Sequence, residues 1–145
     1  MLFSQHLNLN LQAMAFHNTL GAWGEERAAR FLMNKGYTLH ELNWYHEHLE
    51  IDIIAEWFGE LIFVEVKTRS NEDFKDAKDA VNLNKQEHLI KAARAYMSLH
   101  QLDAPFRFDI ITIVGSPEDY EIKHYRHAFT RESWEAEKKY QRETR

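Results

Sequence analysis

The amino-acid sequence predicts an α/β fold in which a mixed β-sheet is flanked by helices. The first reason is the order of the periodic segments, α-β-β-β-α-β-β, in which helical three- and four-residue spacing alternates with β-rich runs. The second is size: 145 residues, 44% of them hydrophobic, suffice for the core of one domain but not two. The third is composition, because 13% aromatic residues and only 5 Gly and 2 Pro exclude low-complexity disorder.

The first elements are a helix over residues 21–36 and a strand over residues 37–44. Apolar side chains recur on one face of this helix, and Gly36 is a natural C-terminal stop. The β-rich runs 49–57 and 61–68 flank Phe58-Gly59 and predict a hairpin.

The second half begins with a polar loop over residues 70–84 and a helix over residues 85–100, whose apolar residues recur at helical spacing. Pro105 then breaks the chain before a strand over 106–114. A turn at Gly115-Ser116-Pro117 leads to a short strand over 120–125. The charged tail, residues 131–145, is expected to be a surface helix.

The chain is predicted to divide into an extension (1–18), one domain (19–130) and a charged C-terminal tail (131–145). The first 20 residues carry no charged side chain, and asparagines interrupt their leucines, which is unlike a secretory signal. No apolar run approaches the ~20 residues of a membrane span, so we expect a cytoplasmic protein that does not insert into membranes.

Charge and cysteine content exclude several functional classes. The chain has no cysteine, so a disulfide framework, a thiolate zinc site and a Cys nucleophile are excluded. The 18 basic and 23 acidic residues give a net charge of −5, which argues against a non-specific nucleic-acid coat. Residues 41–65 hold seven acids and no Lys or Arg, which indicates either a solvated face or a cation site.

The hairpin register places two acids opposite each other. A two-residue loop at Phe58-Gly59 and a four-residue loop over 57–60 both pair residues whose numbers sum to 117. Because Phe disfavours the positive φ of a tight turn, we expect the longer loop. Either loop sets Asp52 opposite Glu65 and Glu50 opposite Lys67, on one face of the hairpin.

Opposed carboxylates repel each other, so this pair predicts a compensating cation. Mg²⁺ commonly takes one or two carboxylates together with waters and substrate phosphates. A third acid, Glu25, lies on the inward stripe of the first helix, although a first-turn Glu can also serve only the helix dipole. Lys67 can likewise act on phosphate or form a salt bridge with Glu50. The segment His46-Glu47-His48 can bind a transition metal or remain a solvated surface.

Several segments together resemble one family. They are Gly21-Ala-Trp-Gly-Glu25-Glu-Arg-Ala28, Gly36-Tyr37, Asn43, Glu50-Ile-Asp52, Phe63-Val-Glu65-Val-Lys67-Thr-Arg69, Lys85, Ala92-Ala93, Tyr96 and Arg107-Phe-Asp109. The pattern, from about Gly21 to Phe129, is similar to the YraN-like family. That family is placed in the PD-(D/E)XK endonuclease-like superfamily and is similar to archaeal Holliday-junction resolvases.

The resemblance implies a restriction-endonuclease-like fold and hydrolysis of phosphodiester bonds dependent on Mg²⁺ or Mn²⁺. Asp52, Glu65 and Glu25 match the metal-binding acids, and Lys67 matches the catalytic lysine of the motif. Apart from the resemblance, Arg69 and Lys85 can contact a nucleic-acid phosphate or be ordinary surface residues. Arg107 and Asp109 share a strand face and are expected to pair structurally. The expected partners are DNA and, by analogy, a second copy of the chain in a homodimer. The alternative is a catalytically silent nucleic-acid-binding or protein-interaction module with the same fold.

Overall fold

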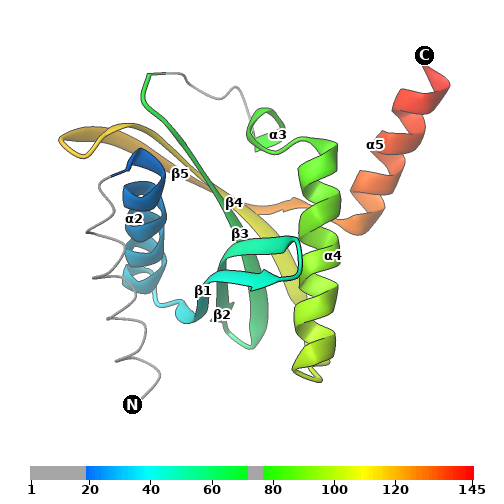
Figure 1. Cartoon of the computed structure of the whole chain (residues 1–145), viewed down its shortest axis with the longest axis horizontal. Coiled ribbons are helices and arrows are strands. Elements are labelled where there is room, and N and C mark those ends of the chain that lie inside the picture. Colours follow the sequence, from blue (N-terminus) through cyan, green and yellow to red (C-terminus); the bar gives the residue numbers. More distant parts are fainter. Residues whose placement is uncertain (1–18, 72–76) are drawn as a thin grey trace.

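The computed structural model describes residues 19–71 and 77–145, and the predicted extension, residues 1–18, lies outside them (Figure 1). Five strands form one mixed sheet in the order β1-β2-β3-β4-β5. Helix α2 (Leu20–Asn34) packs on one face and helix α4 (Leu83–Leu99) on the other. The predicted α/β architecture is therefore confirmed.

The pairing of the strands follows from their connections. The strands β1 (Thr38–His46), β2 (Leu49–Trp57) and β3 (Glu60–Arg69) form an antiparallel meander through two tight turns. The connection from β3 through the helices to β4 (Phe106–Ser116) makes a parallel pair, as a crossover must. The last strand, β5 (Asp119–Phe129), pairs antiparallel with β4.

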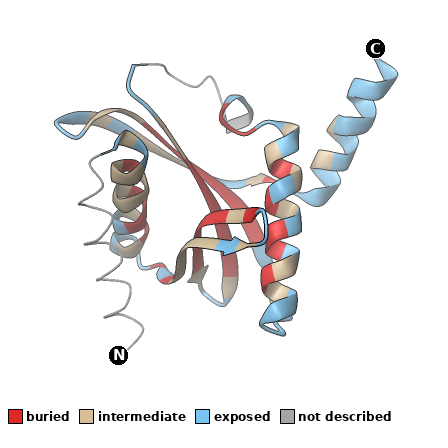
Figure 2. Ribbon diagram, in the orientation of Figure 1, coloured by how far each residue is buried: buried red, intermediate tan, exposed pale blue. Residues whose placement is uncertain are grey.

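Buried side chains form two clusters, one on each face of the sheet (Figure 2). The α2-side cluster joins Ala28, Ala29 and Leu32 of the helix to the strands, as the predicted apolar stripe requires. The α4-side cluster contains Leu89, Ala92, Ala93 and Tyr96, which recur on one face of that helix. The central strands are consequently buried on both faces.

The turn between β2 and β3 differs from the expected one. Trp57 pairs directly with Glu60, so the loop has two residues, with Phe58 at φ 50° and Gly59 at φ 79°. The prediction of a four-residue loop was wrong, because this bulky residue adopts the left-handed conformation that a tight hairpin requires. The predicted register is confirmed, since the paired residue numbers sum to 117.

The remaining differences concern element ends. Part of the predicted loop over 70–84 is helical, because a short helix, α3 (Ala77–Ala80), and the start of α4 lie within it. The last strand is longer than expected. Helix α5 (Arg131–Glu143) confirms the predicted tail helix, and Figure 1 shows it extending away from the sheet. Among the described residues, no helix is long and apolar enough to cross a membrane.

Candidate functional site

Asp52 lies where β2 separates from β3. Regular pairing between these strands ends at Ile53 and Val64, one residue before the predicted pair of acids. Ile51 belongs to the α4-side cluster whereas Ile53 belongs to the α2-side cluster, so β2 changes face around Asp52. The carboxylate replaces the missing backbone partner, because the Val66 N–H donates to Asp52 Oδ2 at 2.9 Å. The strand separation therefore holds a buried carboxylate in one orientation.

Glu65 is the second buried acid, with only 3% of its surface exposed. Its Oε1 lies 3.4 Å from Lys67 Nζ and 3.6 Å from Lys85 Nζ. Its Oε2 is buried and accepts no hydrogen bond from the described residues. A carboxylate oxygen left in this state costs free energy unless something outside the chain pairs with it.

The two acids are electrostatic neighbours. Burial raises the pKa of Asp52 well above its ordinary value, and the charge of Glu65 raises it further, against the hydrogen bond from Val66. The charges of Glu25 and Glu50 act in the same direction. The electrostatic potential at Asp52 is therefore negative, and a bound cation would reduce the repulsion between the carboxylates.

Glu25 reaches this neighbourhood from α2. Burial raises the pKa of its carboxyl, a hydrogen bond with the Asn43 side chain lowers it, and the charges of Glu50 and Glu65 raise it. The helix approaches β3 closely at Gly24, where a Cβ would overlap the side chain of Thr68. Gly24 and Asn43 belong to the family pattern, but no role was predicted for either, although an isolated glycine inside a helical pattern is a signal for close packing.

Lys67 does not pair with the partner that the register assigned to it. Its ammonium lies beside Glu65, whereas Glu50 Oε1 accepts a hydrogen bond from the Tyr45 hydroxyl at 3.4 Å. The reason is that β2 and β3 have already separated at this level, so the register no longer sets Glu50 across from Lys67. Lys67 therefore remains next to the acid pair.

The two predicted nucleic-acid contacts, Arg69 and Lys85, lie on different elements. Arg69 is exposed at the end of β3, two residues beyond Lys67 on the same strand. Lys85 lies in the first turn of α4, and its side chain is 31% exposed. Lys85 therefore contacts the acid pair directly, through Glu65.

The donor set fits a hard divalent cation. It offers two buried carboxylates, one of them with an unpartnered oxygen, and a third acid on α2. Within residues 19–71 and 77–145, no three His, Asp or Glu side chains are already arranged as metal ligands. Mg²⁺ commonly takes one or two carboxylates and completes its coordination with waters and substrate phosphates, so these carboxylates suit its chemistry.

The histidines near the β1–β2 turn do not form such a group. His46 stacks on Trp44, and the ring of His48 faces His88 of α4 with 6.2 Å between the ring centroids. Among the described residues these side chains are not part of a cluster of three potential ligands.

The other charged pair from the sequence, Arg107 and Asp109, is structural, as predicted. The guanidinium donates to both oxygens of Asp109, at 2.9 and 3.1 Å, and both residues are buried. His124 Nε2 lies 2.7 Å from the same carboxylate. This network occupies the α2 side of the sheet, away from α4 and Lys85.

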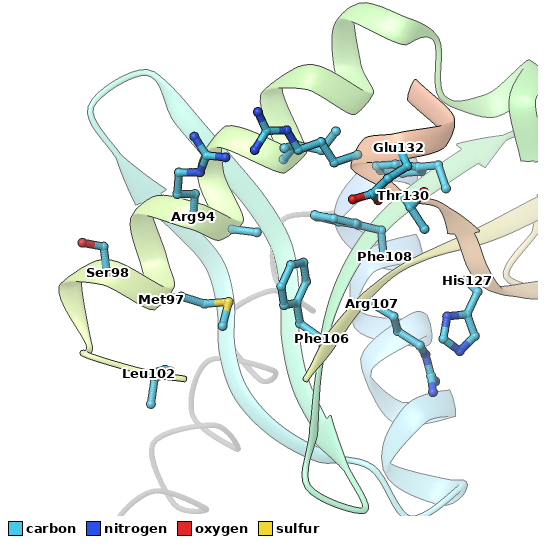
Figure 3. Close-up of a pocket in the computed structure, with 14 residues that line it drawn as sticks. Arg94, Met97, Ser98, Leu102, Phe106, Arg107, Phe108, His127, Thr130 and Glu132 are labelled. Carbon is cyan, nitrogen blue, oxygen red and sulfur yellow. The ribbon is translucent and has the colours of Figure 1, made fainter. Parts of the chain in front are cut away.

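A cavity of about 580 Å³ lies elsewhere, between α4, α5 and the first residues of β4 (Figure 3). Phe106 and Phe108 lie at one side of it, and Arg94 and Met97 of α4 lie at the other. Phe106 pairs with Leu61, four residues before Glu65 along β3, so this cavity is separate from the acid pair.

Comparison with known proteins identifies the family. The family model described as "Uncharacterised protein family UPF0102" matches residues 24–113, which include the acid pair and both lysines. The chain belongs to the UPF0102 family. The UPF0102 protein of Bacteroides thetaiotaomicron is 47% identical over 116 residues, covering 80% of this chain and 96% of that protein. The UPF0102 protein of Phocaeicola vulgatus is 44% identical over 121 residues, covering 83% of this chain and all of that protein.

These matches confirm the resemblance to the YraN-like family. The matched range, residues 24–113, contains the quoted motif residues from Gly24 to Asp109 but not Gly21, Ala22 or Trp23. The matched range ends within β4, so it contains α4 but not β5 or α5.

The acid pair makes a prediction that is independent of any substrate. In EDTA, Asp52→Asn should melt at the same temperature as the wild type or higher, because it removes a like charge and keeps an acceptor for Val66. The folded-state pKa of Asp52 is raised, so its ionised form costs stability at neutral pH and above. Melting curves at pH 8 measure this difference.

Mn²⁺ should reverse the order of the two melting temperatures. A cation that binds only the folded protein stabilises it by ~2.7 kcal/mol at a hundredfold excess over its dissociation constant. The Asn variant should gain much less, because it lacks one anionic ligand. A variant that is markedly less stable in EDTA, or that gains as much from Mn²⁺ as the wild type, would show that Asp52 is not a metal ligand.

Proposed function

We propose that this protein is a Mg²⁺- or Mn²⁺-dependent endonuclease that hydrolyses phosphodiester bonds in structured or branched DNA. The observation that carries the proposal is the buried pair Asp52 and Glu65, with the unpartnered Oε2 of Glu65 and the ammonium of Lys67 beside it. Two acids and a lysine at this spacing match the phosphodiesterase motif that the family resemblance implies.

Asp52 and Glu65, with Glu25 as the third acid, would hold the cation. A bound Mg²⁺ or Mn²⁺ supplies charge for the phosphoryl oxygen and lowers the pKa of a bound water. The chain would position these carboxylates before substrate arrives, because Asp52 accepts from the Val66 N–H and Glu65 pairs with Lys67 on the same strand. This preorganisation is what charge stabilisation in a transition state requires.

Lys67 would act on the phosphate. Its Nζ lies 3.4 Å from Glu65 Oε1, and its side chain is one-third exposed, so a substrate phosphate can reach it. A positive charge there stabilises the negative charge that develops on the phosphoryl oxygens.

The choice of DNA, and of branched or structured DNA in particular, rests on the similarity to archaeal junction resolvases. The same similarity supports a homodimer, which would place two acid sites on one branched substrate. A cytoplasmic location agrees with such a substrate and with the absence of cysteine.

One observation favours a second candidate, a catalytically silent binding module. The net charge is −5, and residues 41–65 contain seven acids without Lys or Arg, which disfavours tight binding to nucleic acid. A divalent cation at the acid pair would neutralise part of that charge, so the two candidates predict different responses to metal.

One experiment separates them. The purified protein is incubated with single-stranded, duplex, flap and four-way-junction DNA in Mg²⁺, Mn²⁺ or EDTA, and the products are resolved on denaturing gels. The endonuclease should cleave at least one structured substrate in Mg²⁺ or Mn²⁺ and none in EDTA. Binding that is detectable in every condition, with no cleavage of any substrate, would support the silent module.

A further inference from the structure

Two lysines share one oxygen of Glu65. Lys67 Nζ and Lys85 Nζ lie 3.4 and 3.6 Å from Oε1, while Oε2 accepts no hydrogen bond from the described residues. The lysines come from different layers of the fold, because Lys67 is on β3 and Lys85 is in the first turn of α4. The second lysine is therefore supplied by the helix rather than by the strand motif.

The first turn of α4 is firmly positioned. The Asn82 side chain accepts a hydrogen bond from the Lys85 backbone N–H at 2.9 Å, and the Gln86 amide donates to the Val81 carbonyl at 3.1 Å. The indole of Trp134 on α5 donates to the Leu83 carbonyl at 3.0 Å. These contacts fix the backbone at Lys85 and leave only its long side chain free to move.

A lysine at this place opposes the helix dipole, which favours acids in the first turn. The first turn of α4 contains no acid, so Lys85 has no counter-charge there. Its ammonium pairs instead with Glu65, which lies on β3 of the sheet. The charge of Lys85 is therefore stabilised by the acid site and not by its own helix.

The charges around Glu65 explain why the Lys85–Glu65 ion pair would depend on whether a cation is bound. Four acids, Glu25, Glu50, Asp52 and Glu65, act on one another there, and two ammonium groups compensate part of their charge. A divalent cation on Asp52 and Glu65 would bring two more positive charges within a few ångströms of both lysines. The two lysine side chains are about equally exposed, at 32% and 31%, but Lys67 lies two residues from Glu65 on the same strand, whereas Lys85 reaches Glu65 from α4.

We propose that Lys85 is a displaceable counter-ion of the acid site. It holds Glu65 in the cation-free protein, leaves when Mg²⁺ or Mn²⁺ binds, and then contacts a phosphate of the DNA substrate. This inference rests on the proposed function, because it requires the acid pair to bind a divalent cation.

The first test measures Mn²⁺ affinity without DNA, by titration calorimetry of the full-length wild type, Lys85→Gln, Lys85→Arg and Lys91→Gln. Lys91 is the matched control, because it lies on the same helix and pairs with Glu87 at 3.3 Å. Lys85→Gln should bind Mn²⁺ about three- to tenfold more tightly, since a competing charge is removed. Lys85→Arg and Lys91→Gln should match the wild type within about twofold.

The second test measures binding of a four-way DNA junction as a function of salt, in Ca²⁺ and in EDTA. In Ca²⁺, the slope of log affinity against log salt should decrease by about one for Lys85→Gln, the loss of one phosphate contact. In EDTA the slope of Lys85→Gln should match that of the wild type, because in the cation-free wild type Lys85 is paired with Glu65 and does not contact DNA. If Lys85→Gln lowers the slope equally in Ca²⁺ and in EDTA, the cation does not displace Lys85 and the inference is wrong.

The outcomes separate this inference from the proposed function. If the wild type binds Mn²⁺ but Lys85→Gln binds it equally or more weakly, the displaceable counter-ion is wrong and the metal site stands. If the wild type binds no Mn²⁺, the proposed function fails, and this inference fails with it.

Discussion

Asp52→Ala and Glu65→Ala should each reduce cation-dependent DNA cleavage by about 10³-fold or more, with the fold retained. Each substitution removes one of the two buried carboxylates that would hold the cation, and with it the charge stabilisation of the transition state. The fold should persist, because neither acid belongs to the hydrophobic clusters on the two faces of the sheet.

Cleavage of the preferred DNA substrate in Mn²⁺ is measured by gel, and circular dichroism checks that each variant is folded. Glu47→Ala is the matched control, because Glu47 belongs to the same acidic stretch and its side chain is 72% exposed. The control should cleave at the wild-type rate. Undiminished cleavage by a folded Asp52→Ala or Glu65→Ala variant would exclude the acid pair as the active site.

The largest effect on stability is expected at Asp109, in the polar network on the other side of the sheet. Its carboxylate accepts from the guanidinium of Arg107, lies 2.7 Å from His124 Nε2, and accepts from the His127 N–H at 3.1 Å. Asp109→Ala leaves the buried Arg107 with the Glu60 carboxylate and the Tyr37 hydroxyl, at 3.0 and 2.7 Å. Breaking such a buried pair costs about 3–5 kcal/mol.

Urea denaturation at pH 7 measures this loss. Glu121→Ala on β5 is the control, because its side chain is 68% exposed and its pairing with Lys123 at 3.8 Å should contribute less than about 1 kcal/mol. A loss at Asp109 no larger than that of the control would show that the network does not stabilise the sheet.

The same network predicts a pH dependence. Burial alone would raise the pKa of Asp109, but the hydrogen bonds from His124 and Arg107, together with the charge of Arg107, lower it below its ordinary value. The stabilisation is therefore complete above the usual carboxylate pKa of about 3.9 and is lost as pH falls through the lowered folded-state value. The difference in unfolding free energy between the wild type and Asp109→Ala should narrow below about pH 4. A constant difference down to pH 2 would contradict this linkage.

The fold was largely predictable because its signals are local. The stripe on α2 and the β-rich run of β2 depend on residues a few positions apart, and the bounds of β2 match the prediction of 49–57. The register of the β2–β3 hairpin was also predictable, because both turn lengths give the same sum. The turn length was not, since it depends on whether the surrounding hairpin can hold Phe58 in the left-handed conformation.

The candidate site was predictable only in part. Alternation along the hairpin predicted Asp52 beside Glu65, and the two acids are electrostatic neighbours, although regular pairing ends one residue before them. The helical stripe was enough to select Glu25. The pairing of Lys67 with Glu65 instead of Glu50 was not predictable, because it follows from the separation of β2 and β3 at Asp52. That separation is produced by packing against two different layers, which no short-range pattern encodes.

Strand and helix periodicity act over a few residues, so the residue pattern was enough to predict the α/β class, the hairpin register and the neighbourhood of the three acids. The close approach of α2 to Thr68 at Gly24 and the ion pair between Lys85 and Glu65 depend instead on tertiary packing. Both contacts join residues far apart in the chain across the packed faces of the sheet. Their distances are set by how the two helices pack on the sheet, and therefore by the whole core.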